Sequence, residues 1–198
     1  MARPASAADE RKERADAARN RARILAAAER LFAERGATNV SMEDVATAAG
    51  VGKGTLYRRY PDRAALAVAL LDEHERRLQQ HLLDGPPPLG PGAPPGERLS
   101  AFYGAMVDLI DRHLELALAA ETGSARFRTG AYQFWRAHLR VLLRDAGVPD
   151  PGDVLAEALL APLAAEFYQQ LRARDVSQAQ IRDGLTSLAR RALALDDK

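Results

Sequence analysis

Residues 41–62 read SMEDVATAAGVGKGTLYRRYPD, and this stretch contains two short amphipathic segments separated by a tight turn. Ser41 and Asp44 have the spacing of a capping box at the start of the first segment, with Asp in place of the usual Glu or Gln. Gly50 can adopt a positive φ in the turn. Four apolar residues would lock the segments at a steep angle: Val45, Ala46, Val51 and Leu56. The pattern predicts a helix-turn-helix.

The second segment is rich in residues suited to a nucleic-acid surface. Gly52 and Gly54 are poor helix formers, but they let a backbone approach a partner closely. The remaining side chains are mostly hydroxyls and cations, which bind phosphates: Lys53, Thr55, Tyr57, Arg58, Arg59 and Tyr60. The alternative is that Tyr57 and Tyr60 are half-buried packing residues and that the arginines are plain surface. For Lys53 and Thr55 the functional interpretation is favoured.

Residues 24–71, ILAAAERLFAERGATNVSMEDVATAAGVGKGTLYRRYPDRAALAVALL, resemble the N-terminal DNA-binding domain of the tetracycline-repressor (TetR) family of bacterial regulators. The resemblance covers the first helix, the helix-turn-helix and the start of a fourth helix. The matching positions are Gly36, Asp44, Ala46, Gly50, Val51, Gly54, Leu56, Tyr57, Tyr60 and Leu66. Arg59 and Pro61 depart mildly, because the family more often has an aromatic residue or His at the first and Phe at the second.

The resemblance implies the residues that lie at a palindromic operator in double-stranded DNA: Ser41, Thr47, Gly52, Lys53, Thr55, Tyr57, Arg58, Tyr60 and Arg63. The hydroxyls of Thr55 and Tyr57 would bind phosphates. Base reading would fall mainly to Gly52 and Lys53, with Thr47 or Arg58, because the N-terminal part of a recognition helix faces base edges. The family further implies a repressor that is released from its operator by a small-molecule effector.

The whole chain is expected to be all-α, since apolar residues recur at spacings of three and four and no stretch shows sustained alternation. The expected helices are 17–35, one from 42, a short recognition helix, 62–83, 98–120, 128–145, 154–172 and 178–195. Asp153 and Ser177 resemble N-caps, the latter with Gln180 three residues on, and Pro162 should bend its helix.

The expected organisation has three parts, and charge is unevenly spread among them. Residues 1–16 would form a flexible basic arm, 17–63 the DNA-binding domain, and 64–198 a ligand-binding and dimerisation domain. Residues 1–63 hold 13 Lys+Arg against 9 Asp+Glu. In the arm region, a role at phosphates or the minor groove stays open for Arg11, Lys12, Arg14, Arg19 and Arg21. The stretch 85–96 has six prolines and four glycines, so a loop is expected; a PxxP ligand is a remote alternative.

The expected second domain has no comparable signature, so its sites rest on apolar patterns. Candidate ligand-binding residues mix apolar and polar groups: Phe102, Tyr103, Met106, Ile110, His113, Phe127, Phe134, Trp135 and His138. The last two helices carry apolar seams that would close a four-helix bundle in a homodimer: Leu155, Leu159, Phe167, Ile181, Leu185, Leu188 and Ala192. An aromatic candidate can equally be plain core, and any seam residue can belong to an intramolecular core. We expect a ligand in this domain to act on the DNA-reading domain through the helix at 62–83.

Other classes of protein have less support. No GxSxG, P-loop, GxGxxG after a strand or HExxH is present, so neither an enzyme nor a metal or cofactor site is expected. A helix-turn-helix protein whose second half binds a protein partner is a third interpretation. The chain has no cysteine, secretory signal or apolar stretch of membrane-spanning length, which favours a cytoplasmic location away from membranes.

Overall fold

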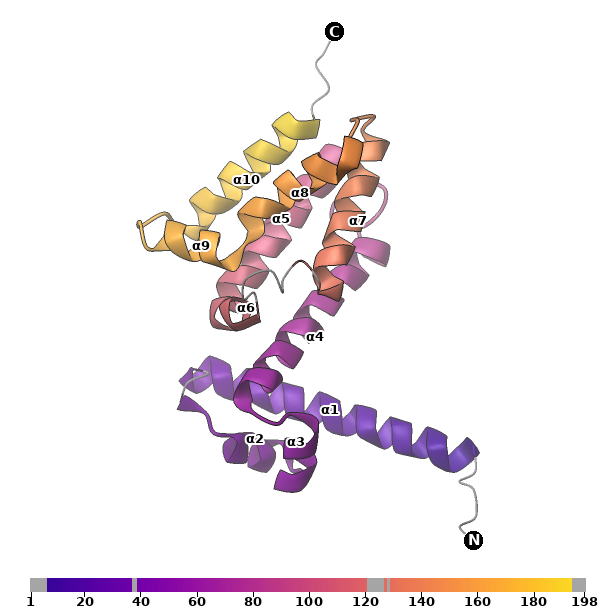
Figure 1. The fold of residues 1–198 in the computed structure, drawn as a ribbon, viewed down its shortest axis with the longest axis vertical. Coiled ribbons are helices and arrows are strands. Elements are labelled where there is room, and N and C mark those ends of the chain that lie inside the picture. Colours follow the sequence, from indigo (N-terminus) through magenta and orange to yellow (C-terminus); the bar gives the residue numbers. More distant parts are fainter. Residues whose placement is uncertain (1–6, 37–38, 121–126, 128, 194–198) are drawn as a thin grey trace. The chain divides into compact units, whose positions relative to one another are not determined.

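The computed structural model describes residues 7–36, 39–120, 127 and 129–193, and these residues form helices and turns without a strand (Figure 1). The prediction of an all-α fold is confirmed. The chain divides into two compact units, Met1–Leu70 and Leu71–Lys198. The division falls within α4 (Arg63–Asp84), whereas the sequence places a boundary after residue 63.

The first unit contains α1 (Ala7–Arg35), α2 (Met42–Ala49), α3 (Lys53–Arg59) and the beginning of α4. α1 begins at Ala7 and not near residue 17, so residues 7–16 of the expected flexible arm are helical; residues 1–6 lie outside the described residues. The stretch is rich in Ala, Glu and Arg, which are strong helix formers, and this explains the longer helix. α1 ends before Gly36, which has a φ of 78°.

The predicted local signals around α2 are present in the structure. The backbone N–H of Asp44 donates to Ser41 Oγ at 3.1 Å, and the N–H of Ser41 donates to Asp44 Oδ2 at 3.0 Å, which completes the capping box. Gly50 has a φ of 61°, and the N–H of Val51 donates to the carbonyl of Ala46 at 3.0 Å. These bonds fix where α2 begins and ends.

A small apolar core holds the first unit together. Each helix of this unit contributes buried apolar side chains to the core: Ile24 and Ala28 from α1, Val45 from α2, Leu56 from α3 and Leu66 from α4. α3 has only seven residues and Leu56 is its one buried residue. Isolated helices of this length are unstable in water, so the packing of Leu56 is what keeps α3 helical.

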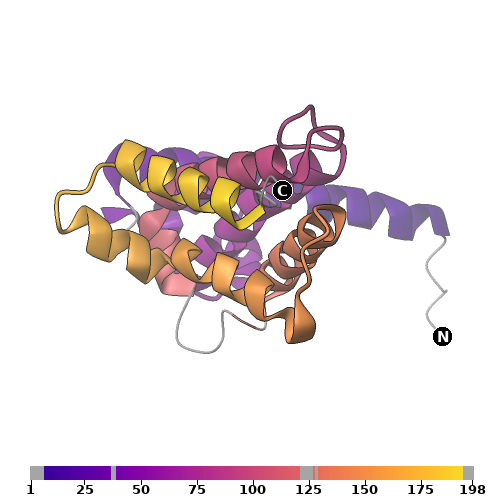
Figure 2. The same ribbon diagram turned by 90° about the horizontal axis from the view of Figure 1, so that it is seen from above.

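The second unit contains the rest of α4 and six further α-helices: α5 (Pro95–Arg112), α6 (Leu114–Ala120), α7 (Gly130–Asp145), α8 (Val154–Leu160), α9 (Ala165–Arg172) and α10 (Gln178–Leu193). α10 packs along α5, and Figure 2 shows the two helices side by side. The core includes Leu99 and Phe102 of α5 and Leu139 and Leu142 of α7. Tyr103 is also buried, and its hydroxyl donates to the carbonyl of Leu159 at 2.9 Å.

Three helix boundaries in the second unit can be compared with those predicted from the sequence. The stretch 98–120 is broken at His113, whose ψ of 32° departs from helical geometry. The predicted helix 154–172 is broken and not only bent at Pro162, because a short 3-10 turn (Ala161–Leu163) and the extended residue Ala164 separate α8 from α9. Ser177 caps α10 as predicted, since the N–H of Gln180 donates to its hydroxyl at 3.2 Å.

The predicted cap at Asp153 is wrong. Its side chain makes no capping bond to α8; it pairs with Arg136 at 3.1 Å and Arg140 at 3.0 Å on α7. Asp150 caps α8, accepting hydrogen bonds from the N–H groups of Leu155 at 2.7 Å and Ala156 at 3.0 Å. A left-handed turn at Gly152 lets the earlier aspartate reach the helix end, and the spacing of residues along the chain does not reveal such a turn.

Candidate nucleic-acid interface

α3 presents most of the residues predicted to meet DNA. Lys53, Arg58 and Arg59 are exposed, and 40% of Tyr57 is exposed, whereas Leu56 points into the core. Thr47 at the end of α2, Gly52 before α3 and Arg63 at the start of α4 are also exposed. Thr55 is half-buried. Cationic and hydroxyl side chains therefore share one accessible surface on the first unit.

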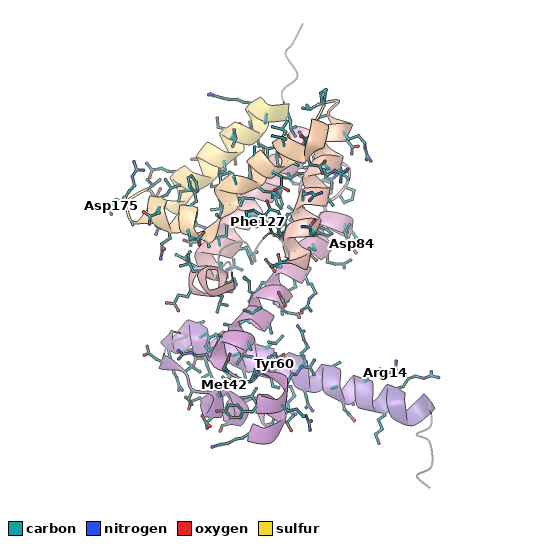
Figure 3. All side chains as sticks on the ribbon, viewed as in Figure 1. Arg14, Met42, Tyr60, Asp84, Phe127 and Asp175 are labelled. Atoms are coloured by element: carbon teal, nitrogen blue, oxygen red, sulfur yellow. The ribbon has the colours of Figure 1, made fainter. Side chains whose placement is uncertain are left out.

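Two predicted contact residues have other roles in the structure. Tyr60 is buried, with 5% of its surface exposed, so the expectation of an exposed side chain at the duplex is not met; Figure 3 labels it. The residue ends α3 and its ring contributes to the core, which sequence pattern alone does not distinguish from exposure. The hydroxyl of Ser41 is exposed, but it donates to Asp44 Oδ2 at 2.7 Å within the capping box.

Glu43 joins the two helices at the same surface, a role that the sequence did not indicate. Its Oε1 accepts a hydrogen bond from the Tyr57 hydroxyl at 3.1 Å and lies 3.8 Å from Lys53 Nζ. A hydrogen bond from its own backbone N–H and that from Tyr57 lower the pKa of the Glu43 carboxyl, and the bond to Glu43 raises the pKa of Tyr57. Glu43 is therefore ionised at neutral pH and holds two of the predicted DNA-binding side chains.

A hollow of about 680 Å³ lies between α1 and α3. Arg14, Arg58 and Arg59 line this hollow together with Asn20 and Thr55. The guanidinium of Arg59 reaches the carbonyl of Ala17 at 3.4 Å. Of the cations in the predicted arm region, Arg14 thus lies next to α3, because α1 is long enough to bring it there.

The predicted ligand-binding residues are mostly core residues of the second unit. Eight of them are buried or half-buried: Phe102, Tyr103, Met106, Ile110, His113, Phe134, Trp135 and His138. Phe127 is 49% exposed and its ring meets that of Tyr132 edge-on. A hollow of about 1050 Å³ lies elsewhere, between α5, α10 and the proline-rich loop, and is lined by residues outside the predicted set.

Burial changes the histidines of this core. The rings of His74 and His113 stack with centroids 3.9 Å apart, and the ring of His138 lies 5.4 Å from that of Phe102. Burial lowers the pKa of His113 and of His138 to about 4, so both are neutral at pH 7. Arg98 adds to the effect at His138.

The predicted dimer seam divides into two groups. Leu159, Ile181 and Leu185 pack in the core of their own unit, while Leu155 and Ala192 are half-buried beside it. Phe167 and Leu188 are exposed, at 44% and 42%. An amphipathic pattern shows that a helix has an apolar face without showing whether that face meets its own chain or a second copy.

Among the described residues, no cluster of three or more His, Cys, Asp or Glu side chains is placed to hold a metal ion. Within the same part of the chain, no helix has the length and apolar character needed to cross a membrane.

The first unit matches known regulators in sequence. The family model described as bacterial regulatory proteins of the tetR family matches residues 24–70. An uncharacterized HTH-type transcriptional regulator of Mycobacterium tuberculosis is 43% identical over 61 residues, which are 31% of this chain and 30% of that protein. A Staphylococcus aureus HTH-type transcriptional regulator is 47% identical over 58 residues, or 29% of this chain and 31% of that protein. The matches thus span less than a third of these relatives.

Solved structures match the fold over nearly the whole chain. A TetR transcriptional regulator from Rhodococcus sp. RHA1 has a TM-score of 0.63 at 24% identity, covering 91% of this chain and 98% of that one. NalD of Pseudomonas aeruginosa, the secondary repressor of the MexAB-OprM multidrug efflux pump, has a TM-score of 0.56 at 24% identity, covering 92% and 100%. Fold and exposed α3 define a helix-turn-helix protein with a helical second unit. Residues 24–70 match the family model of bacterial regulatory proteins of the tetR family, and the described part of the chain has the fold of the solved TetR-like structures.

Two glycines near α3 should respond in opposite ways to alanine. Gly50→Ala should destabilise the first unit by roughly 1–2 kcal/mol, because alanine disfavours the left-handed backbone. Its Cβ would also stand 2.5 Å from Arg23 Nη2, which donates to the Gly50 carbonyl. Gly54→Ala should stabilise by about 0.5–1 kcal/mol, because Gly54 lies within a helix with open space around it. Urea unfolding followed by circular dichroism measures both, and equal effects would contradict the role given to the Gly50 turn.

Proposed function

We propose that this protein is a DNA-binding transcriptional regulator that acts as a repressor, with α3 entering the major groove of its operator. The observation that carries this proposal is the surface of α3, where Lys53, Tyr57 and Arg58 are exposed while Leu56 anchors the helix in the core. The tetR family match over residues 24–70 supports it. The repressor assignment draws support from NalD, a fold neighbour that is itself a repressor.

The roles proposed within this surface follow from position on α3. Gly52 and Lys53 begin the helix, so they would face base edges, with Thr47 or Arg58 beside them. Tyr57 lies one turn further along and would bind a phosphate. Phosphate contacts position a protein on DNA and carry no direct sequence information, whereas base contacts do. The two kinds of residue should therefore differ when exchanged.

Lys53→Ala should weaken operator binding by about 1–3 kcal/mol and relax the sequence preference at one base pair. Tyr57→Phe should weaken binding to all sequences by a similar factor, since it removes a hydrogen bond to a charged group. Fluorescence anisotropy with operator and scrambled duplexes, repeated over a range of salt concentrations, measures both effects. Arg76→Ala serves as a charge-matched control, because Arg76 is an exposed α4 residue that pairs with Glu73. Unchanged operator affinity in both test variants would refute the assignment.

We propose further that the protein works as a homodimer, because a twofold dimer presents two recognition helices about 34–36 Å apart to a palindromic operator. The exposed side chains of Phe167 on α9 and Leu188 on α10 are the members of the predicted seam that are free to meet a second copy. Leu159, Ile181 and Leu185 support the interface from inside the protomer.

Substitutions at exposed seam residues should affect dimer formation, whereas a substitution at a buried seam residue should affect folding. The double variant Phe167→Glu/Leu188→Glu should sediment as a folded monomer, because both side chains are already exposed in the protomer. Leu185→Glu should unfold the second unit, since it buries an unpaired carboxylate. Analytical ultracentrifugation gives the mass and circular dichroism the helix content. A wild-type protein that sediments as a monomer at micromolar concentration would remove the dimer from the proposal.

The second unit is proposed to bind a small-molecule effector among Phe102, Met106 and Trp135. The buried nitrogen atoms without a hydrogen-bond partner in the described part of the second unit include Arg98 Nε, His113 Nε2 and His138 Nε2. Buried polar atoms normally have partners, so these atoms favour a ligand that carries polar groups on an apolar body. Because His113 and His138 are neutral at pH 7, they would act as hydrogen-bonding groups and not as cations.

An effector that releases the operator must bind the DNA-incompetent state more tightly, so operator should weaken effector binding by the same factor. A screen for small molecules that release labelled operator would supply the compound, and calorimetry would give its affinity with and without DNA. His138→Phe should weaken its binding, whereas His81→Phe, at an exposed position on α4, should not. Equal affinities with and without operator would mean that the second unit does not regulate DNA binding.

A further inference from the structure

Glu43 is an acidic residue within a surface that is otherwise suited to a polyanion. It lies in the first turn of α2, beside Asp44, but the two carboxylates serve different partners: Asp44 completes the capping box, and Glu43 reaches across to α3. Glu43 Oε1 binds the Tyr57 hydroxyl at 3.1 Å and lies 3.8 Å from Lys53 Nζ. Nothing in the capping chemistry of α2 requires this contact with α3.

The same two side chains are the ones proposed to bind DNA, so Glu43 competes with the duplex for them. A phenol has one hydrogen to donate, and Tyr57 donates it to Glu43 in the free protein. When Tyr57 and Lys53 turn to DNA, the Glu43 carboxylate is left without them next to a polyanion. Like charges at an interface are costly, so this arrangement weakens binding to DNA in general.

One kind of DNA site removes the cost. In the major groove, cytosine N4 and adenine N6 are amino groups that donate hydrogen bonds, and a glutamate carboxylate accepts from them. Such a base opposite Glu43 replaces the partners that it gives up. Guanine and thymine present acceptors at the corresponding major-groove positions, which would leave the carboxylate facing further negative charge.

We propose that Glu43 is a specificity-determining residue: it holds Lys53 and Tyr57 in the free protein and permits tight binding only where a cytosine or adenine amino group faces it. The inference rests on the proposed DNA-binding function. Glu43 would add a penalty against incorrect sequences to the attractive contacts of α3. This role explains why an acidic side chain occupies the surface.

The test compares the full-length wild-type protein with Glu43→Gln, whose amide oxygen still accepts a hydrogen bond from Tyr57 but carries no charge. Selection from a random duplex library gives the preferred sequence of each protein. Anisotropy titrations then give the affinities for the wild-type operator and for a scrambled duplex. Glu34→Gln is the matched control, because it makes the same change in net charge at an exposed α1 residue that pairs with Arg30.

In the wild-type motif we expect a position restricted to cytosine or adenine, and we expect this restriction to relax in Glu43→Gln. Glu43→Gln should bind the scrambled duplex more tightly, and its ratio of operator to scrambled affinity should fall about tenfold, the scale of one base contact. Glu34→Gln should keep the wild-type motif and ratio. Thermal unfolding should show that both variants are folded.

The outcomes separate this inference from the proposed function. A selective wild-type protein whose motif and affinity ratio are unchanged by Glu43→Gln would overturn the role of Glu43 and leave the regulator intact. The same holds if Glu34→Gln lowers the ratio as much, because the effect would then be one of net charge alone. A wild-type protein that selects no sequence would overturn the proposed function, and the inference with it.

Discussion

The left-handed turn at Gly50 is the constraint on which the candidate DNA surface depends. With a φ of 61°, Gly50 ends α2 and redirects the chain so that Leu56 of α3 enters the core. Arg23 on α1 donates to the Gly50 carbonyl at 3.0 Å and ties the turn to the longest helix of the unit. Exposure of Tyr57 follows from the burial of Leu56, because consecutive positions on a helix face different directions.

The first turn of α2 serves both stability and the proposed recognition of DNA. Asp44 satisfies the helix end by binding Ser41, and hydrogen bonds from Ser41 lower the pKa of its carboxyl. Glu43, one residue earlier, points to α3 and binds Tyr57. Asp44 thus fixes the start of the helix, while Glu43 holds a side chain of the candidate DNA surface. Swapping the two acidic residues would disturb both the cap and the contact with α3. In the second unit, some residues of the predicted dimer seam lie in the core and others are exposed.

Sequence reasoning succeeded where a structural feature depends on residues close together in the chain. The caps at Ser41 and Ser177 and the turn at Gly50 are of this kind, because their bonds join residues three to five apart. It failed where neighbours come from other helices. The burial of Tyr60 and the reach of Glu43 to Tyr57 depend on how helices cross, and sequence periodicity does not determine that. The early start of α1 required only helix propensity, which was available from its alanines and charged residues.

The shortness of α3 has a consequence for genetics. Seven residues that include Gly54 and bury only Leu56 cannot remain helical outside the unit that holds them. A change in the core beneath α3 therefore removes the recognition surface as surely as a change on that surface. A screen for mutants that lose the proposed repression would recover both kinds of position, and surface contacts would be recognised only among those mutants whose protein still accumulates in the cell.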